Sequence, residues 1–304
     1  MKLLLTGVDG QVGFELFHSL QPFAEVIPSV LREGRGTVAM DLSDYHSIVT
    51  TLNQVRPDII VNPAAYTAVD KAETNVELAK AINSTAPAII GEWAAKHHAR
   101  VVHFSTDYVF AGEGTVPYRE DDRCAPLNVY GQTKLDGDLA LLSSGCQCMI
   151  FRTSGVFGSY GQNFVKTMLR LGKQREMISV VDDQYGAPTS ARVLADTVAQ
   201  ILGRFDWRLL ISPPAVFHLT CSGETSWYGF AEEIFRLARQ YGVELKLTSL
   251  KPIPSSDYPL PAARPKNWRL DCTKIRNQFN VRQVPWQDAL EQTFMAILAF
   301  DNSL

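Results

Sequence analysis

The sequence lacks any long uninterrupted run of apolar residues. The apolar segment Phe294–Phe300 is seven residues long, whereas a helix needs about 20 such residues to cross a bilayer. The apolar start, Met1–Gly7, is followed by the charged residues Asp9 and Glu15, which leave it shorter than the core of a signal peptide. We therefore expect a cytoplasmic protein with no membrane segment.

The sequence also lacks an excess of basic residues. Its 29 Lys and Arg residues are matched by 32 Asp and Glu residues, so the net charge is −3 and the isoelectric point is near 6.1. A nucleic-acid-binding protein needs a basic surface that neutralises phosphates, so nucleic acid is not an expected partner. The 304 residues are 46% hydrophobic and 20% charged, which is a globular composition and excludes a disordered or fibrous chain. A small molecule is the partner we expect.

Cysteine and histidine are too few and too scattered for a disulfide framework or a metal site. The five cysteines include one close pair, Cys146 and Cys148, whose spacing suits neither a paired framework nor a zinc site with four ligands. We expect reduced thiols. Of the six histidines, His97 and His98 are neighbours that point about 100° apart on a helix. No bound metal is expected.

Short apolar segments alternate with amphipathic segments over the first half of the chain. The predicted strands are Lys2–Thr6, Glu25–Ser29, Ile59–Asn62, Val101–Ser105 and Cys148–Thr153. The predicted helices are Val12–Leu20, Tyr45–Val55 with Asp44 or Ser43 as its cap, Val76–Ile82, Ala86–His97 and Tyr130–Leu142. This alternation predicts a Rossmann-like α/β fold with a doubly wound parallel sheet, in which ligands bind beyond the carboxyl ends of the strands.

The composition of the sequence changes after about residue 205. Prolines then punctuate short elements: Pro213, Pro214, Pro252, Pro254, Pro259, Pro261 and Pro265. We expect helices at Trp227–Tyr241 and Trp286–Phe300 in this region. Residues 1–152, completed by part of 176–212, are assigned to a dinucleotide-binding domain, and residues 153–175 and 213–304 to a smaller substrate-binding domain.

A glycine-rich loop directly follows the first predicted strand. Glycines at positions 7, 10 and 13 have the G-x-x-G-x-x-G spacing, and the loop opens a predicted helix. A backbone without Cβ atoms can approach a pyrophosphate, and the amino end of the helix supplies N–H donors and partial positive charge. The predicted cofactor-binding residues of this loop are Gly7, Asp9, Gly10, Gln11, Val12 and Gly13.

The choice of cofactor should be determined after the second strand. A carboxylate there would bind the adenosine 2′-hydroxyl, and an arginine would bind a 2′-phosphate. The segment Ile27–Arg35 has no carboxylate at the strand tip, but it contains Arg32 and Arg35. We expect NADPH, with Arg32 as the contact to its 2′-phosphate, and NADH stays an alternative because loop arginines are common.

The catalytic residues are predicted at a strand tip and on a helix. Ser105, Thr106 and Asp107 end the fourth predicted strand, and Tyr130 and Lys134 lie at i and i+4, on one helix face. The Lys134 ammonium and an oxidised nicotinamide would lower the pKa of the Tyr130 phenol toward the working pH. Tyr130 is then the predicted proton donor to a carbonyl oxygen that receives hydride, and Thr106 bonds the same oxygen.

These motifs resemble the extended short-chain dehydrogenases/reductases, and within them the dTDP-4-dehydrorhamnose reductase family. The stretches that carry the resemblance span nearly the whole chain in the order of the family: Gly7–Leu16, Arg56–Glu73, Val101–Gly112, Pro126–Gly137, Phe151–Ser154, Asn163–Leu171 and Asp183–Thr189. The resemblance implies reduction of the C4 keto group of dTDP-4-dehydro-L-rhamnose to dTDP-L-rhamnose, in dTDP-rhamnose and polysaccharide biosynthesis.

The resemblance also implies roles for further residues. Asp41 and Leu42 should border the adenine, while Ala64, Ala65, Thr67 and Ser105 should line the cofactor. Asp107 and Tyr108 should contact the sugar. Gly155 occupies a position where the family usually has a tryptophan, so the sugar pocket is either wider or filled by another aromatic residue, for which Tyr160 and Trp268 are candidates. Trp268 could instead anchor its proline-rich loop.

Two properties of the family are less expected in this chain. Some members dimerise through a metal held by three glutamates, of which only Glu15 is matched here, with Arg192 and Ala296 at the other positions. A homodimer stays open, but a metal bridge is not expected.

Besides the reductase, two alternatives stay open: reduction of another dTDP-4-keto-6-deoxyhexose, and a non-catalytic NADP-binding regulatory subunit like that of methionine adenosyltransferase.

Overall fold

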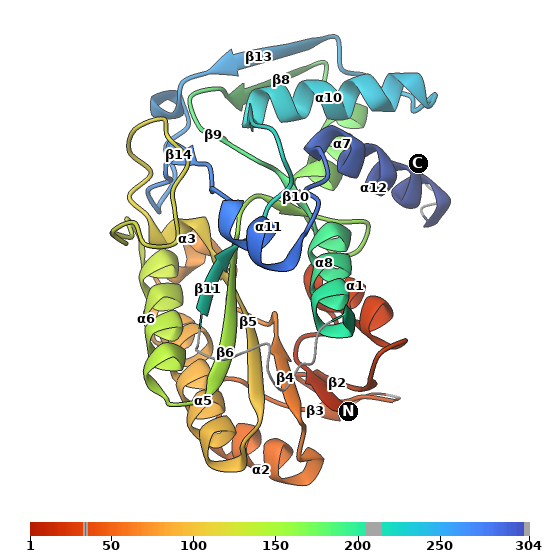
Figure 1. The fold of residues 1–304 in the computed structure, drawn as a ribbon. Coiled ribbons are helices and arrows are strands. Elements are labelled where there is room, and N and C mark those ends of the chain that lie inside the picture. Colours follow the sequence, from red (N-terminus) through yellow and green to blue (C-terminus); the bar gives the residue numbers. More distant parts are fainter. Residues whose placement is uncertain (33, 35, 205–214, 301–304) are drawn as a thin grey trace.

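A seven-stranded parallel sheet forms the centre of the computed structural model, which describes residues 1–32, 34, 36–204 and 215–300 (Figure 1). Arg35, Pro213 and Pro214 lie outside the described residues. The strand order is β11-β6-β5-β4-β1-β2-β3. The strands are β1 (Lys2–Leu5), β2 (Glu25–Val30), β3 (Val38–Ala39), β4 (Ile59–Asn62), β5 (Arg100–Thr106), β6 (Gln147–Thr153) and β11 (Ala215–His218). The predicted Rossmann-like sheet is thereby confirmed, and β3 and β11 are the strands that the sequence did not predict.

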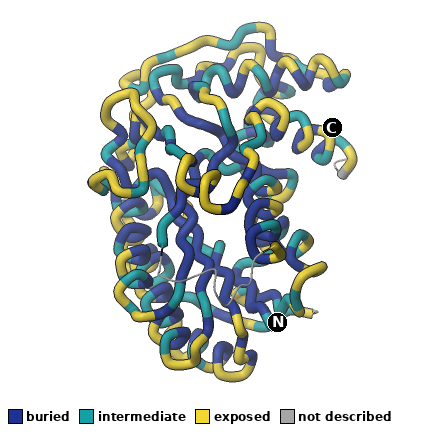
Figure 2. The backbone as a smooth tube through the Cα atoms, viewed as in Figure 1, coloured by how far each residue is buried: buried dark blue, intermediate teal, exposed yellow. Residues whose placement is uncertain are grey.

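Helices cover both faces of this sheet because successive residues of a buried strand point to opposite faces. Leu3 and Leu5 pack in one cluster with α1 (Gln11–Leu20) and α8 (Ala191–Arg204). Leu4 packs on the other face, in a cluster with α2 (Tyr45–Val55) and α5 (Ala86–His97). Figure 2 shows the resulting buried layer along the strands. The sheet is therefore apolar on both faces, so polar side chains that carry out chemistry are expected at the ends of its strands.

Local capping explains why α2 begins where the sequence predicts. The Asp44 side chain accepts hydrogen bonds from the amides of His46 and Ser47, so the predicted cap of α2 is Asp44. Arg56 then ends α2 in a left-handed conformation, with φ of 47°. The helix predicted at Val76–Ile82 is shorter: α4 (Val76–Lys80) passes into a π-helical turn, η1 (Ala81–Thr85), which leads into α5.

The connections between β4 and β6 carry the helix that matters most for the site. They contain α3 (Val69–Ala72), the 3₁₀ turn η2 (Asp107–Val109) and α6 (Val129–Ser143). The Asn128 side chain caps α6 by accepting a hydrogen bond from the amide of Gly131. This cap fixes the first turn of α6 next to the tip of β5.

A second group of elements lies beyond the carboxyl end of the sheet. Its helices α7 (Phe164–Gln174), α10 (Trp227–Gln240) and α12 (Trp286–Phe300) share one hydrophobic cluster around Phe230 and Phe235. The helices predicted from Trp227 and Trp286 are confirmed, whereas α7, α8 and α11 (Thr273–Phe279) were not predicted. The short strands are β7 (Val156–Phe157), β8 (Met177–Val181), β9 (Tyr185–Gly186), β10 (Thr189–Ser190), β12 (Thr225–Ser226), β13 (Ser249–Ile253) and β14 (Asn267–Trp268). The 3₁₀ turn η3 (Ser255–Asp257) lies between β13 and β14.

The predicted division into two domains stays a prediction, although β11, from the segment 213–304, joins the large sheet through β6. All five cysteines are unpaired. None of the helices in the described ranges combines the length and the apolar character that a bilayer crossing needs.

Candidate active site

A cavity of about 640 Å³ lies where β1, β4, β5 and β6 end. It brings together most of the predicted site residues, and these lining residues are Gly7, Asp9, Gly10, Gln11, Val12, Gly13, Ala64, Ala65, Thr67, Ser105, Thr106, Asp107, Tyr108, Tyr130, Lys134 and Gly155. The predicted residues that do not line it are Arg32, Asp41, Leu42 and Trp268. The site therefore lies at the end of the sheet where the fold class predicts a ligand.

Close backbone contacts explain the glycines of the loop after β1. A Cβ atom on Gly13 would lie 2.0 Å from the carbonyl oxygen of Gly7, and one on Gly7 would lie 2.8 Å from the Cβ atom of Ala64. Gly7 also has a φ of +57°, which favours glycine. Gly10 supplies no side chain to cap α1, so the first amides of this helix face the cavity without a side-chain partner. The loop therefore fits an anionic group such as a pyrophosphate.

The tip of β5 presents three neighbouring polar side chains to the cavity. The Thr106 hydroxyl donates to Asp107 Oδ1 at 3.2 Å and accepts from the amide of Tyr108 at 3.2 Å. The Tyr108 ring lies edge-on to the Tyr130 ring, with 5.4 Å between their centroids. Burial raises the pKa of Asp107 to about 7, and the hydrogen bond from Thr106 partly offsets this rise. Thr106 and Tyr130 are thus held side by side at the strand tip.

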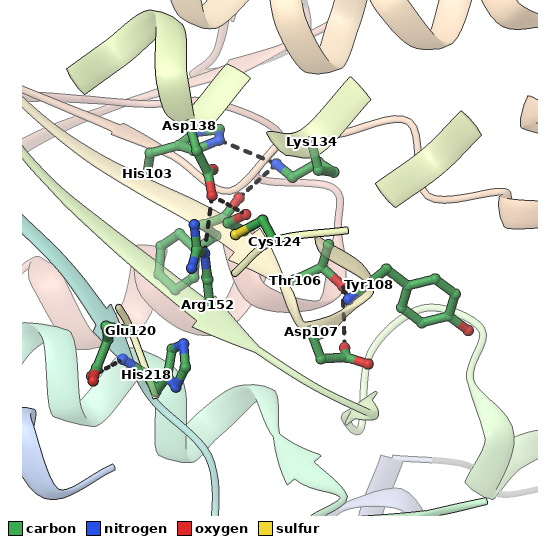
Figure 3. A network of polar contacts seen from close by, with 12 residues as sticks. His103, Thr106, Asp107, Tyr108, Glu120, Cys124, Lys134, Asp138, Arg152 and His218 are labelled. Atoms are coloured by element: carbon green, nitrogen blue, oxygen red, sulfur yellow. Dashed lines mark hydrogen bonds and ion pairs between the residues drawn. The ribbon is translucent and has the colours of Figure 1, made fainter. Parts of the chain in front are cut away.

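The Tyr130 phenol and the Lys134 ammonium have different surroundings in the structure. Burial raises the pKa of the Tyr130 phenol, and the hydrogen bond with Thr106 opposes this rise. The Lys134 ammonium is directed to β5 instead, where Nζ donates to the Phe104 carbonyl at 2.6 Å and lies 3.1 Å from Nε2 of His103 (Figure 3). Burial sets the direction of this shift and Lys134 is not among its causes, so a lowering of the phenol pKa by Lys134 together with an oxidised nicotinamide stays a prediction.

A buried ion pair between Asp138 on α6 and Arg152 on β6 lies near Lys134 (Figure 3). Asp138 on α6 accepts from Arg152 Nε at 3.2 Å and from the Ser105 hydroxyl at 2.9 Å. Burial raises the pKa of Asp138, whereas Arg152 and Lys134 lower it. Burial lowers the pKa of Lys134 to about 8, and the Asp138 carboxylate opposes this shift. The sequence had not indicated Asp138 or Arg152 as part of the site.

The residues predicted for the adenosine lie apart from the cavity. Arg32 is exposed in the segment after β2. The Asp41 carboxylate accepts hydrogen bonds from the amide and hydroxyl of Ser43, at 2.8 and 2.6 Å, and Leu42 packs against the cluster of α2 and α5. Their roles toward a cofactor stay predictions.

The space next to Gly155 is filled by Trp268. The indole lies 3.0 Å from the position that a Cβ atom on Gly155 would take, and it stacks on Trp227 with 5.0 Å between ring centroids. Trp268 is 3% exposed. Tyr160, the other candidate, stacks on Phe14 at 4.4 Å and does not line the cavity. Trp268 does not line the cavity either and packs on Trp227, as an anchor of its loop would, so its contact with a sugar stays a prediction.

The loop before α7 forms a part of the cavity wall that the sequence had not indicated. Gly161, Gln162 and Asn163 line the cavity, and Asn163 donates to Gln11 Oε1 at 3.0 Å, which ties this loop to the glycine loop. The signal for it was available: Asn163 precedes the amphipathic helix α7 and caps it by accepting from the amide of Lys166. The other lining residues not predicted are Pro63, Val69, Phe104, Thr153, Ser154 and Val156.

The position of the glutamate-bound metal of some family members holds an ion pair. Arg192 Nη1 lies 3.9 Å from the buried Glu15 carboxylate, and the Ser159 hydroxyl donates to Glu15 at 3.4 Å. Burial raises the pKa of Glu15, and Arg192 lowers it. Within the described ranges, the structure shows no group of three or more His, Cys, Asp or Glu side chains that could hold a metal ion.

The parallel sheet, its glycine loop and the Tyr130–Lys134 pair define a Rossmann-like α/β protein of the short-chain dehydrogenase/reductase type. A family model described as RmlD substrate binding domain matches residues 1–298, and the chain belongs to this family. This membership confirms the resemblance seen in the sequence.

Named relatives agree with this family. A protein of Salmonella typhimurium named dTDP-4-dehydrorhamnose reductase is 44% identical over 290 residues, covering 94% of this chain and 95% of that protein. The crystal structure of a dTDP-4-dehydrorhamnose reductase from Clostridium acetobutylicum has a TM-score of 0.88 and 34% identity, covering 98% of this chain and 100% of that chain. The enzyme of the same name from Bacillus anthracis, solved in complex with NADP, has a TM-score of 0.84 and 32% identity, covering 97% and 98%.

Proposed function

We propose that this chain reduces the C4 keto group of dTDP-4-dehydro-L-rhamnose with NADPH and so forms dTDP-L-rhamnose. One observation carries the proposal: Thr106, Tyr130 and Lys134 line the same cavity as the loop of Gly7 and Gly13. A reduction of this kind needs a dinucleotide cradle next to a proton donor, and the cavity offers both. The names of the relatives point to the same reaction.

The cofactor would lie along the loop after β1 and the tips of β4 and β5. Gly7 and Gly13 leave space for the pyrophosphate, and the amino end of α1 supplies N–H donors to it. Ala64, Ala65 and Thr67 would contact the cofactor further along the cavity. When bound, NADPH supplies a hydride to the carbonyl carbon. Arg32 would favour NADPH over NADH, which stays the alternative.

Tyr130 would donate a proton to the C4 oxygen as the carbonyl is reduced. Burial keeps its phenol neutral because it raises the pKa, so the group holds the proton that it has to deliver. The Thr106 hydroxyl would bond the same oxygen, and the Lys134 ammonium would stabilise the phenolate that remains. Asp107 and Tyr108, which line the cavity beside Thr106, would contact the sugar.

The remaining predictions concern the substrate and its surroundings. The segments 153–175 and 213–304 would bind the nucleotide sugar, while the first 152 residues hold the cofactor. One alternative is the reduction of another dTDP-4-keto-6-deoxyhexose. Gly155 supports this alternative because it lines the cavity and contributes no side chain to the wall that would face the sugar. A homodimer without a metal bridge and a cytoplasmic location also stay predictions.

The experiment that tests the proposed function follows the nicotinamide absorbance with dTDP-4-dehydro-L-rhamnose generated in situ, and then identifies the sugar formed. We expect oxidation of NADPH and dTDP-L-rhamnose as the product. A matched reaction with the Tyr130→Phe variant controls for non-enzymatic loss of NADPH. Oxidation with a different sugar product would support the alternative substrate. Binding of NADPH without oxidation would support a regulatory subunit.

A further inference from the structure

A continuous row of buried polar side chains leads from the sheet to Lys134. The Thr6 hydroxyl lies 2.6 Å from Asn62 Oδ1, and the carboxamide nitrogen of Asn62 lies 3.1 Å from His103 Nδ1. The other ring nitrogen, Nε2, lies 3.1 Å from Lys134 Nζ. His103 is fully buried and Lys134 is 2% exposed. The row starts directly after β1, crosses β4 and β5 and ends at α6, on the wall of the cavity.

The chemistry of these groups decides how the row is hydrogen-bonded. Burial, together with the nearby Lys134 ammonium, holds the pKa of His103 well below its usual value, so the imidazole is neutral and has one donor and one acceptor. An ammonium only donates, so His103 Nε2 has to accept from Lys134 and Nδ1 has to carry the hydrogen. Asn62 then offers its oxygen to Nδ1–H and its nitrogen to Thr6, after a rotation of its carboxamide by about 180°. Both ring nitrogens of His103 and both ends of the Asn62 carboxamide have a compatible partner in this arrangement.

The opposite arrangement leaves a conflict at Lys134. If Asn62 donated to Nδ1, the hydrogen of His103 would be on Nε2 and would point at Nζ. Two donors would then face each other unless Lys134 were a neutral amine. The charge of Lys134 and the tautomer of His103 are therefore coupled through one short contact.

We propose that His103 is a positioning residue for the keto reduction: its Nε2 atom accepts one N–H of Lys134 while the Phe104 carbonyl accepts a second, so that the third points into the cavity. This inference rests on the proposed function, in which Lys134 stabilises the phenolate of Tyr130. An ammonium has three N–H groups, and the protein uses two of them. His103 itself does not line the cavity.

The charged groups around Lys134 set the direction of the expected pH effect. Asp138, one turn further on α6, raises the pKa of Lys134, and Arg152 on β6 pairs with Asp138 at 3.2 Å. Burial outweighs this and lowers the pKa of Lys134 to about 8. An acceptor at His103 Nε2 favours the charged form, so its loss lowers the pKa of Lys134 further. The fraction of charged Lys134 then falls at a lower pH than in the wild type.

Two amide substitutions at position 103 separate the two ring nitrogens. In His103→Gln the side-chain oxygen reaches the place of Nε2 and retains the acceptor for Lys134. In His103→Asn it reaches only the place of Nδ1 and loses that acceptor. We expect His103→Gln to retain most of kcat, and His103→Asn to lose about 10- to 100-fold with the alkaline limb of its pH profile moved to lower pH. Thermal unfolding of both variants is measured alongside. Equal activity and equal pH profiles of the two folded variants would overturn the proposal.

Nitrogen-15 NMR of the wild-type protein tests the contact without any substrate. The two ring nitrogens of a neutral imidazole have distinct shifts, and the His103→Gln variant identifies which signals belong to His103. We expect the Nδ1–H tautomer at about pH 7, where Lys134 is mostly charged. The Nε2–H tautomer would overturn the proposal. Since this measurement needs no turnover, it decides on the contact even if no dTDP-keto-sugar is reduced, which would be a failure of the proposed function alone.

Discussion

The Trp268 indole occupies the space next to Gly155 that a side chain at position 155 would need. A Cβ atom there would lie 3.0 Å from the indole and 3.3 Å from the backbone of Pro188. Gly155 also has a φ of +54°, a conformation that residues with a side chain rarely adopt. The two residues come from segments more than a hundred positions apart, so the small residue at one position and the large one at the other form a complementary pair.

The first prediction tests this pair. Gly155→Ala should lower the free energy of unfolding by more than Gly145→Ala does. Gly145 has a φ of +79° and nothing within 4 Å of its Cβ position, so its substitution adds only the backbone strain, about 1–2 kcal/mol. Gly155→Ala adds the contact with the indole to the same strain. Urea denaturation of both variants measures the difference.

The background variant Trp268→Leu provides the control for the first prediction. If the indole causes the extra loss, the difference between the two alanine variants should shrink in this background, with a coupling of about 0.5 kcal/mol or more. An unchanged difference would show that Pro188, not Trp268, limits the side chain at position 155.

The second prediction concerns the proton donor. Tyr130→Phe retains the ring and its packing against Tyr108 but removes the hydroxyl. General acid catalysis contributes about 10²–10⁴ in rate, or about 3–5 kcal/mol of barrier, so kcat should fall by that factor. NADPH binding, measured by fluorescence titration, should change little. Tyr118→Phe is the matched control, because the Tyr118 phenol bonds the amide of Glu113 away from the cavity. Comparable kcat values for the two variants would exclude Tyr130 as the donor.

Much of the fold could be predicted because local signals agree with the sheet. Ile59–Asn62 is a buried apolar segment and forms β4 with the predicted bounds. Tyr45–Val55 has a cap at its amino end in Asp44 and forms α2 as predicted. β11 was missed because Ala215–His218 is short and becomes a strand only through its parallel pairing with β6. Its signal is tertiary, since β6 lies more than sixty residues earlier.

The site was predicted in its composition but not in its contacts. The i, i+4 spacing places Tyr130 and Lys134 on one face of α6, and both line the cavity. That spacing carries no information about β5, which is packed against this helix. His103 lies 31 residues before Lys134, so the contact that directs the ammonium to the strand could not be derived from spacing along the helix.

The third prediction concerns cofactor preference. Arg32 is exposed after β2, where a 2′-phosphate is expected. Arg32→Ala should weaken NADPH binding more than NADH binding, by about 1.5–3 kcal/mol if a charge-assisted hydrogen bond is lost. Dissociation constants of both cofactors for both proteins give this difference. Arg170→Ala serves as the control, since Arg170 is exposed on α7 and does not line the cavity. Equal loss for NADPH and NADH would show that Arg32 does not contact the phosphate.

The fourth prediction concerns the buried carboxyl group of Asp107. Burial raises its pKa to about 7 in the folded protein, whereas an unfolded aspartate titrates at about 3.9. Between these two values the folded state binds a proton that the unfolded state does not bind, so stability falls as the pH rises through this window. Asp107→Asn removes the ionisation and retains an oxygen for Thr106. Above about pH 7 the variant should therefore be more stable than the wild type, on the order of 2–4 kcal/mol.

Urea denaturation of the wild type and of Asp107→Asn between about pH 4 and 8 measures this effect, because the difference between the two proteins should grow across the window and then level off. Asp70→Asn is the control of opposite sign. The Arg264 guanidinium bonds the Asp70 carboxylate at 2.6 and 2.7 Å and lowers its pKa, so Asp70 stabilises the folded state above the pKa of an unfolded aspartate and loses this effect as the pH falls. Its substitution should therefore destabilise the protein at neutral pH. If the curves of the wild type and of Asp107→Asn run parallel over the whole range, Asp107 ionises in the folded protein as it does in the unfolded chain, and the burial of its carboxyl group does not control its charge.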